Sequence, residues 1–538
     1  MTHKAGIKFG YSILLGICVL ILLLLILYPT ARMVFRALEN WNCKTVLSAR
    51  SALVIWNTFL LSIVSVICSG IVGTAFAVVL HRYTFVGHST VATLANLPFA
   101  LPPLVGGVAF YYLIGRDGLM PRCIEHWLGI PDFYPKQLFA IVLIHTYSFY
   151  VFFYAMVGSA LESFDYSLIE AARNLGASPL LILFRVVLPL LKPSLRGAAL
   201  LTFMSSCASF TAPLFFGNGF PVLSVRIYEA ASQFKEDEAL SLTLALAVLS
   251  LGGLALFRSR STMPTRGASK GVRHLPKTSL SLRISLPCIL VFLTVLLAPH
   301  ATILWLSFID HTAWHTELLP THFTWGNYTK LFEDPAALKP LLNSFRMSAY
   351  AVLAVFLVGL PIAHWLAAKR PGSKWLSILV MMPWALPGTV VAMNLLVAAN
   401  DPWVPAQMAV VLLPIAYFVR SIPLFTRISV AALESVDSSL LEAARTLGAS
   451  SVYGFRRITL PLVGPAWAAG GAMVFVSCLG EFVTSILLYR PENTPISVQI
   501  NMFMRGVGIG TAFAYSTILL LFNISAFALA RRFSSRIL

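Results

Sequence analysis

The sequence predicts an all-α integral membrane protein of two parallel six-helix domains, fused in one chain with about 12 transmembrane helices. Three observations predict this fold. Hydrophobic residues make up 58% of the 538 residues and charged residues only 11%, with a mean hydropathy of +0.81, which no water-soluble domain of this size could carry. Long apolar runs recur along the whole chain. One polar segment occurs twice, at 161–178 and 433–450.

Each apolar run is long enough to cross a bilayer as a helix, which takes about 20 residues. The runs are nearly uncharged and rich in Leu, Val, Ala and Phe, whereas strands of a membrane barrel would alternate over about ten residues. The first run is too long for a signal peptide and lacks a small-residue cleavage site, so we expect an uncleaved span. The expected spans lie near 9–30, 52–80, 91–114, 138–160, 195–215, 239–257, 284–307, 343–368, 375–398, 407–428, 466–488 and 510–530.

Basic residues predict the orientation, because Lys and Arg favour the cytoplasmic side of a membrane protein. They gather near both termini, in both copies of the polar segment and in a central stretch, whereas most acids lie in the alternate loops. We therefore expect both termini and both polar segments to face the cytoplasm. The net charge of +18 then reflects topology and attraction to membrane lipid, and nucleic acid is not an expected partner because no soluble basic domain is present.

The central stretch holds seven basic residues, no acid and several Gly, Ser and Pro residues, which indicates a linker. We expect a first transmembrane domain over 1–257, a basic cytoplasmic linker over 258–283 and a second transmembrane domain over 284–538. An even number of spans per half makes the repeat parallel rather than inverted. Two further matches support a duplication, Leu97–Pro102 with Met382–Pro387 and Asn57–Phe59 with Asn343–Phe345.

The seven cysteines and eleven histidines are scattered through the chain. No cysteine pair has C-x-x-C spacing, so we expect apolar fillers rather than a disulfide framework or a metal site. No span carries H-x-x-x-H. A membrane enzyme, which would need a cluster of such side chains near one interface, is therefore not expected.

Each copy of the polar segment predicts two short helices joined at a glycine. Ser167 and Glu170 fit a capping box that starts a helix. The helix should stop at Gly176, which can adopt the left-handed conformation. The Ser-Pro pair that follows starts a second short helix, which we expect to end near Pro189. The second copy repeats the pattern with Ser439, Glu442, Gly448 and Pro461.

Such a hinged helix pair suits docking into the groove of a partner protein. A surface hairpin that merely links two spans is the alternative. It is disfavoured because the two copies match at Glu, Ala-Ala, Arg, Leu-Gly-Ala-Ser and Leu-Pro.

The pattern Glu-Ala-Ala, three residues, Gly, nine residues, an aliphatic, one residue and Leu-Pro resembles the EAA loop of permease subunits in binding-protein-dependent ABC importers. It occurs at Glu170–Pro189 and at Glu442–Pro461. The resemblance covers essentially the whole chain, as a fused pair of permease domains. It implies a transport subunit of the bacterial inner membrane rather than an enzyme. Two ATP-binding cassette subunits would bind on the cytoplasmic face, and a solute-binding protein would deliver the solute outside.

In similar permeases the loop helix sits in a cleft of the ATPase subunit, so the resemblance implies two coupling helices here. The alanine pair would allow close approach, and the glutamate would cap its helix or meet a basic group of the ATPase. The chain contains no G-x-x-x-x-G-K-[ST], so we expect ATP and Mg on the partners and no cofactor or metal on this chain. The implied ATPase-coupling residues are Glu170, Ala171, Ala172, Arg173, Gly176, Glu442, Ala443, Ala444, Arg445 and Gly448.

Polar residues inside a membrane point to a translocation pathway or to helix packing. Glu481 is the only acid well within an apolar run, and Ser209 stands at the matching position of the first half. Glu481 would contact a cation or a gate, or it would be a carboxyl hydrogen-bonded between helices. Pro102 and Pro387 predict broken or kinked helices, which would line the pathway or serve packing alone.

The cargo is predicted by resemblance only. Fused permeases for ferric iron are the most similar, through Trp325–Tyr328, the two proline segments and Ser209–Pro213. Similar fused chains serve thiamine and aminoethylphosphonate, and split relatives serve polyamine, sulfate or molybdate. A proton-coupled secondary transporter of twelve spans would also divide into six plus six. We would then expect buried acid–base pairs in several spans and no paired docking loops.

Overall fold

The computed structural model describes residues 2–39, 48–257, 278–279, 281–310, 314, 317–319, 321–504 and 508–534. Most of the expected linker, 258–283, lies outside these residues. The described chain is almost wholly helical, and its one sheet is a two-residue parallel pair of β1 (Tyr83–Thr84) with β2 (Thr278–Ser279).

The first half contains long helices separated by short turns, with η1 and η3 as π turns and η2 as a 3-10 turn. Its helical elements are α1 (Thr2–Leu22), η1 (Leu23–Leu27), α2 (Tyr28–Glu39), α4 (Ala49–Arg82), α5 (His88–Leu94), η2 (Leu97–Ala100), α6 (Pro103–Ile114), α7 (Leu119–Leu128), α8 (Gln137–Glu162), α9 (Ser167–Asn174), α10 (Pro179–Ile182), η3 (Leu183–Val187), α11 (Leu188–Cys207), α12 (Thr211–Phe216), α13 (Leu223–Ser232) and α14 (Glu236–Phe257).

The second half repeats this order, with η5 as a π turn in the place of η3. Its helical elements are α15 (Leu282–Ser307), α17 (Gly326–Glu333), α18 (Pro335–Ala367), α19 (Ser373–Ala385), α20 (Gly388–Ala399), η4 (Ala406–Val410), α21 (Leu412–Glu434), α22 (Ser438–Thr446), α23 (Ser451–Gly454), η5 (Phe455–Thr459), α24 (Leu460–Leu479), α25 (Ser485–Leu488), η6 (Pro491–Asn493), α26 (Ile496–Met504) and α27 (Ile509–Ser534).

Nine helices of the described chain are long and apolar enough to cross a membrane, and eleven spans result if each of two bent helix pairs counts as one. One pair joins His88–Ala100 to Pro103–Leu128 at 102°, and the other joins Ser373–Ala385 to Gly388–Ala399 at 107°. Both bends follow the proline segments, so the expected breaks at Pro102 and Pro387 are confirmed. The fold is the expected all-α integral membrane fold.

The expected span over 195–215 differs from the structure. It corresponds to α11, whose Lys192 and Arg196 lower its hydropathy, and which ends at Cys207 before the short α12. Pro213 has no N–H for the carbonyl four residues earlier and its ring crowds that carbonyl, so a continuous helix is disfavoured here. The expected span over 466–488 is interrupted at the matching place, between α24 and α25.

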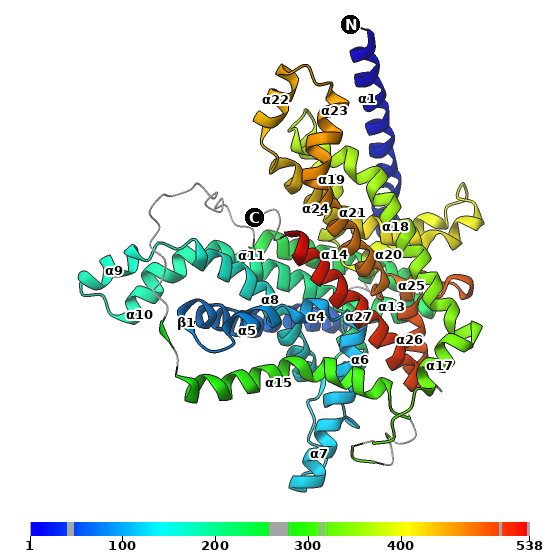
Figure 1. Cartoon of the computed structure of the whole chain (residues 1–538). Coiled ribbons are helices and arrows are strands. Elements are labelled where there is room, and N and C mark those ends of the chain that lie inside the picture. Colours follow the sequence, from blue (N-terminus) through cyan, green and yellow to red (C-terminus); the bar gives the residue numbers. More distant parts are fainter. Residues whose placement is uncertain are drawn as a thin grey trace.

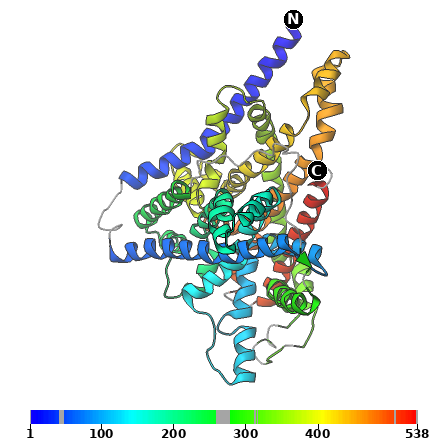
Figure 2. The same ribbon diagram turned by 90° about the vertical axis from the view of Figure 1, so that its left-hand side faces the viewer.

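The first helices of each half pack against the other half. Tyr11 Oη of α1 donates to the Pro361 carbonyl of α18 at 2.8 Å, and α2 lies against α20. In the reverse direction α15 lies against α6, and Tyr147 Oη of α8 donates to the Leu296 carbonyl of α15 at 2.9 Å. The two halves therefore form one body, from which α9–α10 and α22–α23 project in different directions (Figures 1 and 2).

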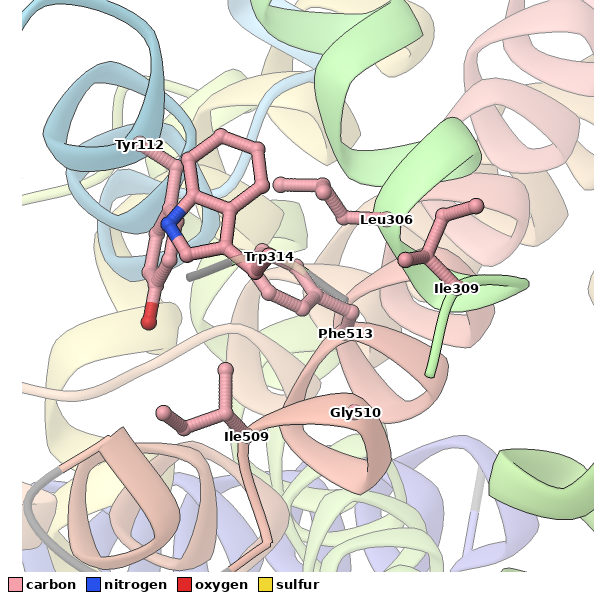
Figure 3. Close-up of a pocket in the computed structure, with 7 residues that line it drawn as sticks. All are labelled: Tyr112, Leu306, Ile309, Trp314, Ile509, Gly510 and Phe513. Carbon is pink, nitrogen blue, oxygen red and sulfur yellow. The ribbon is translucent and has the colours of Figure 1, made fainter. Parts of the chain in front are cut away.

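An aromatic junction joins the halves where α6 meets Trp314 and α27 (Figure 3). Tyr112 of α6 contacts Trp314, with ring centroids 5.3 Å apart, and Phe513 of α27, with centroids 4.9 Å apart. The Arg122 guanidinium stacks over the Trp314 ring at 4.7 Å. The cavity among these residues is about 10 Å³, no more than one water would occupy. The junction is therefore packed, with no room for a solute.

An ion pair joins the halves at a second junction. The Arg32 guanidinium of α2 donates to both carboxylate oxygens of Asp401, which follows α20, at 2.8 to 3.0 Å. Tyr28 also donates to this carboxylate. The Asp401 side chain is 2% exposed, and the hydrogen bonds from Arg32 hold its pKa below the usual range. Because both partners are oriented and Asp401 is buried, this contact fixes α2 against the second half.

Candidate functional site

The first polar loop turns at Gly176 through two backbone hydrogen bonds. Gly176 N donates to Arg173 O at 2.9 Å, and Ala177 N donates to Ala172 O at 3.0 Å. This pair of bonds is a Schellman motif, which closes a helix with one left-handed residue. The φ angle of Gly176 is 79°, so the predicted left-handed conformation is confirmed.

The second polar loop has the same corner. Gly448 N donates to Arg445 O at 3.0 Å, Ala449 N donates to Ala444 O at 2.9 Å, and φ of Gly448 is 82°. A Cβ added at Gly448 would meet no atom within 4 Å. The glycine is therefore required by the backbone conformation and not by lack of space.

The helix starts are close to those predicted, but the capping groups differ. Asp165 Oδ1 accepts from Ser167 N at 3.0 Å, and Asp437 Oδ1 accepts from Ser439 N at 2.9 Å. The expected capping box with a serine cap is therefore wrong. The reason is that aspartate caps at least as well as serine and stands two positions earlier. The hydrogen bond from the Ser439 N–H lowers the pKa of Asp437.

The second short helix starts as predicted, since Ser178 Oγ accepts from Leu181 N at 3.4 Å and Ser450 Oγ accepts from Tyr453 N at 3.2 Å. Its predicted end is wrong. In each half a five-residue π turn, η3 or η5, carries it directly into the next long helix. A wider turn leaves room for the proline ring that would clash in a regular α-helix.

The tips of both loops expose leucine. Leu175 and Leu447, which directly precede the two glycines, are each 88% exposed. Leu168 and Leu440, in the first turns of α9 and α22, are each 46% exposed. Sequence reasoning treated the loops as polar and missed these four side chains. Their identical position in the repeat was the available signal. Each loop therefore presents two exposed leucines at matching positions, an arrangement also found at protein interaction sites.

The remaining implied coupling residues lie in these two helices. Glu170, Ala171, Ala172 and Arg173 belong to α9, and Arg173 Nη1 donates to Tyr166 Oη at 3.1 Å. The second set, Glu442, Ala443, Ala444 and Arg445, belongs to α22.

Ser209 and Glu481, the predicted pathway residues, lie at the breaks that follow α11 and α24. The carbonyl of each break residue accepts a hydrogen bond from a serine hydroxyl of α13 in the first half or α26 in the second. Ser224 Oγ donates to Ser209 O at 2.5 Å, and Ser497 Oγ donates to Glu481 O at 2.7 Å. The two breaks therefore have the same backbone support.

The side chains at the two breaks differ. In the first half, Ser209 Oγ is 2.8 Å from Nε2 of His145 on α8. The other ring nitrogen of His145 is 2.8 Å from Ser65 Oγ and 3.2 Å from Ser206 Oγ. Ser65, His145 and Ser206 are buried and Ser209 is half-buried, and the cluster contains no carboxylate, lysine or arginine. Sequence reasoning missed His145, because a single histidine within an apolar run gives no signal of its partners.

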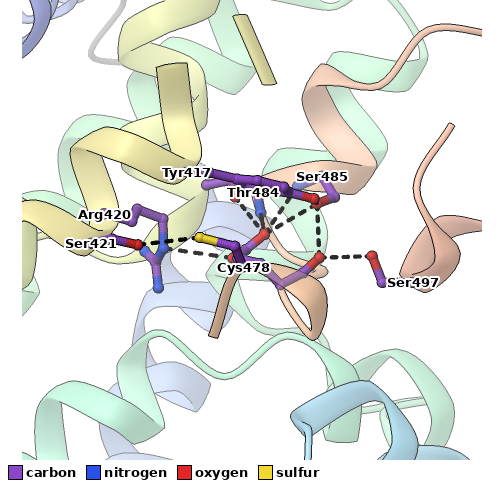
Figure 4. Close-up of polar contacts among 8 residues, drawn as sticks. Tyr417, Arg420, Ser421, Cys478, Thr484, Ser485 and Ser497 are labelled. Carbon is purple, nitrogen blue, oxygen red and sulfur yellow. Dashed lines mark hydrogen bonds and ion pairs between the residues drawn. The ribbon is translucent and has the colours of Figure 1, made fainter. Parts of the chain in front are cut away.

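In the second half the break carries an ion pair. Arg420 Nε of α21 is 3.6 Å from Glu481 Oε1. Glu481 Oε2 accepts from the Thr484 N–H at 3.0 Å and from the Ser485 N–H at 3.2 Å, and also from the hydroxyls of both residues. Figure 4 shows Arg420 on one side of Cys478 and Thr484 and Ser485 on the other. The carboxylate is therefore hydrogen-bonded within its own segment and faces a cation on α21, and its role in transport stays a prediction.

The two breaks and the two bends meet between the halves. Phe210 and Phe482, one residue beyond each break, contact each other with ring centroids 5.7 Å apart. A Cβ added at Gly480 would lie 3.1 Å from Pro102 Cβ. Gly388, next to Pro387, lies against Arg420. The four predicted pathway residues are therefore brought to one central region.

Within the described residues, no three His, Cys, Asp or Glu side chains are grouped as metal ligands would be. The described cysteines are free, namely Cys18, Cys68, Cys123, Cys207, Cys288 and Cys478.

Comparisons with known proteins agree with this duplicated architecture. Residues 73–259 and 356–538 each match the family described as the inner membrane component of binding-protein-dependent transport systems. A probable ABC transporter permease of Sinorhizobium fredii is 28% identical, over 90% of this chain and 88% of that protein. A ferric transport system permease of Actinobacillus pleuropneumoniae is 27% identical, over 96% of this chain and 77% of that protein.

A half-length relative also matches. The molybdenum transport system permease of Escherichia coli K12 is 32% identical, over 31% of this chain and 73% of that protein. With two matched regions that together cover more than half of its length, the chain belongs to the family of inner membrane components of binding-protein-dependent transport systems.

Proposed function

We propose that α9 and α22 are two coupling helices, each docked on one ATP-binding cassette subunit, and that the chain is the translocation subunit of an ATP-driven importer. The observation that carries this proposal is the pair of identical glycine corners that each present a leucine with 88% exposure. Exposed leucines on a defined corner fit an apolar cleft in a partner. Two such corners call for two partner subunits.

The connection from each loop to the centre supports mechanical coupling. α10 continues through η3 into α11, and α23 continues through η5 into α24. Each of these long helices has 20 residues, about 30 Å at 1.5 Å per residue. It ends at the central break with Ser209 or Glu481. A displacement of a docked loop would therefore reach the contact between Phe210 and Phe482 through a continuous helix.

This function sets the remaining partners and the orientation. The chain lies in the bacterial cytoplasmic membrane, with both loops and both termini in the cytoplasm. The ATPase subunits bind ATP and Mg, and a solute-binding protein delivers the cargo on the outer face. These assignments rest on the family and on the distribution of basic residues.

Ferric iron is the favoured cargo. The support comes from ferric transport permeases that align with this chain over 96%, 82% and 88% of its length, whereas molybdenum and sulfate permeases align with half of it or less. The same machinery serving thiamine, aminoethylphosphonate or a polyamine is the alternative. The binding protein, not this chain, would make most of that choice.

Reconstitution tests the proposal. The chain, its co-purified ATPase and its binding protein are placed in vesicles, and ⁵⁵Fe uptake and ATP hydrolysis are measured with each component omitted in turn. We expect uptake only with ATP, the ATPase and the binding protein together. Uptake that follows an imposed proton gradient without the ATPase would identify a secondary transporter instead.

A further inference from the structure

Arg420 lies within a membrane span yet keeps 33% of its side chain exposed. It stands eight residues into α21, about 12 Å along the helix. A guanidinium that faced lipid at this depth would be strongly disfavoured, so its exposed part would face water. Arg427 lies seven residues further, on the same face and about 10 Å nearer to the polar loop, and it is exposed.

The Arg420 guanidinium is incompletely paired. Among the described residues its one ion-pair partner is Glu481, approached by Nε at 3.6 Å, which is longer than a hydrogen bond. The second oxygen of that carboxylate is already occupied by Thr484 and Ser485. The two terminal nitrogens of Arg420, which carry four N–H donors, are left for another acceptor.

The surrounding backbone leaves room for this guanidinium. A Cβ added at Gly388 would lie 2.9 Å from Arg420 Nη1. Gly388 is the first residue of α20, directly after the 107° bend at Pro387. The charged group therefore lies against the first residue after the bend of the broken span.

The corresponding helix face of the first half, on α8, carries no charge at the matching positions. Residues 272 positions earlier on α8 are Ser148 and Ala155. Ser148 is half-buried like Arg420, and Ala155 is exposed like Arg427. The two helix faces are thus equivalent in placement, and α21 carries positive charge at two positions where α8 carries none.

We propose that Arg420, followed by Arg427, forms an oxyanion-binding wall of the translocation pathway, and that the cargo crosses with a carboxylate, phosphate or similar oxyanion group exposed. This inference rests on the proposed transport function. A guanidinium binds such groups through two parallel N–H donors. Glu481 holds Arg420 in position between transport events, and Arg427 receives the group on the way to the loop side.

The wall sets the form of the cargo. Two guanidinium groups would repel a bare ferric ion or an organic cation. Iron would therefore pass with oxyanion ligands such as citrate. A free oxyanion would bind to the same two arginines. Both kinds of cargo therefore present the same chemical group, which comes either from a metal complex or from the anion alone.

Uptake by the complete complex in vesicles separates these sources. The probes are ⁵⁵Fe-labelled ferric citrate, ¹⁴C-citrate alone, ³⁵S-sulfate, ³²P-phosphate and ³H-thiamine. We expect one of the oxyanion-bearing probes to be taken up, and ⁵⁵Fe with citrate would identify the ligated metal. Arg420→Gln should lower that uptake at least tenfold. Arg420→Lys keeps the charge but lacks the two parallel N–H donors, and should lower uptake about threefold. Hydrolysis stimulated by the binding protein should change less than twofold.

Glu481→Gln distinguishes an oxyanion wall from a structural ion pair. The amide oxygen can still accept from Thr484 and Ser485, and Arg420 stays available, so uptake should remain within threefold of the unsubstituted chain. Arg346→Gln is the matched control, an arginine within α18 that already donates to Asn343 at 3.2 Å. It should leave uptake unchanged.

Three results would overturn the inference: full uptake by Arg420→Gln, equal damage from Arg420→Gln and Glu481→Gln, or transport of thiamine that is insensitive to both. A wild-type complex with neither uptake nor stimulated hydrolysis would count against the proposed function itself.

Discussion

The two halves of the chain anchor the equivalent turn with an asparagine followed by a hydroxyl side chain. In the first half, Asn57 Nδ2 donates to Pro221 O at 3.0 Å, and Thr58 Oγ1 accepts from Leu223 N at 2.9 Å. These bonds fix the loop before α13 to the start of the long helix α4. They explain why one short motif recurs in each half.

The second half reproduces these bonds. Asn343 Nδ2 donates to Thr494 O at 3.2 Å, and Ser344 Oγ accepts from Ile496 N at 2.8 Å. At the centre the halves differ, with a histidine hydrogen-bonded to serines in one and an arginine–glutamate pair in the other. The repeat therefore keeps the backbone support and varies the central chemistry. Under the proposed transport function, both halves would make the same movement and only the second would present charge to the cargo.

The largest effect is expected from replacing the exposed leucine at the tip of both loops in one variant. The double substitution Leu175→Asp and Leu447→Asp should lower uptake about 100-fold, and each single substitution about tenfold. A carboxylate buried unpaired in an apolar cleft costs several kcal/mol, and about 1.4 kcal/mol is a factor of ten. Vesicle uptake measures the change. Leu128→Asp, at a 67% exposed site on α7, is the control, and full activity of the double variant would refute twin docking.

The next largest loss of uptake is expected from substitutions at the two glycine corners. Gly176→Val and Gly448→Val should each lower uptake about tenfold while ATP hydrolysis continues, because a β-branched residue with positive φ costs about 1–3 kcal/mol and shifts the corner. Membrane insertion should be unchanged. Gly464→Val, in α24 with open space around it and no positive φ, is the control. Normal uptake by both corner variants would show that the angle between the short helices does not matter.

A smaller effect concerns the ion pair that joins α2 to the second half. Because Arg32 lowers the folded-state pKa of Asp401, its stabilisation is complete above the unfolded pKa of about 3.9 and is lost as pH falls below it. The melting temperature in detergent should hold from pH 7 to pH 5 and drop below about pH 4. Asp401→Asn should melt lower at pH 7 and show a weaker acid-dependent drop. Identical pH profiles for the two proteins would contradict this role.

The smallest effect is expected on the melting temperature, from substitutions that remove the hydroxyl anchoring each turn. Thr58→Val and Ser344→Ala each leave a buried backbone N–H without its acceptor, which costs about 1–3 kcal/mol. We expect the melting temperature to fall by a similar few degrees in both variants. Thr302→Val is the control, since that hydroxyl bonds only its own helix at 2.8 Å. A lower melting temperature for only one of the two variants would show that the two turns contribute unequally to stability.

The sequence was sufficient for features set by local chemistry. Composition predicted the membrane fold, and proline segments predicted the bends before α6 and α20. Glycine after a helical segment predicted the left-handed corners at Gly176 and Gly448. Each of these depends on residues within one or two turns of each other, where spacing is informative.

Features that depend on distant residues were missed. The breaks at Ser209 and Glu481 lie inside predominantly apolar runs, and their support comes from hydroxyls 15 and 16 residues further along. His145 is 64 residues from Ser209. Arg420 belongs to a different helix from Glu481. No periodicity along the chain records such pairings, because helix packing creates them.

Crosslinking tests the central claim most directly. Cysteine placed at Ala171 or Ala443, both exposed, is treated with a short bifunctional reagent in the complex with the ATPase subunits, in the presence and absence of ATP. We expect both positions to crosslink to an ATPase subunit, with yields that change together when ATP is added. Absence of a crosslink from either position, in a complex that still transports, would contradict the assignment of twin coupling helices.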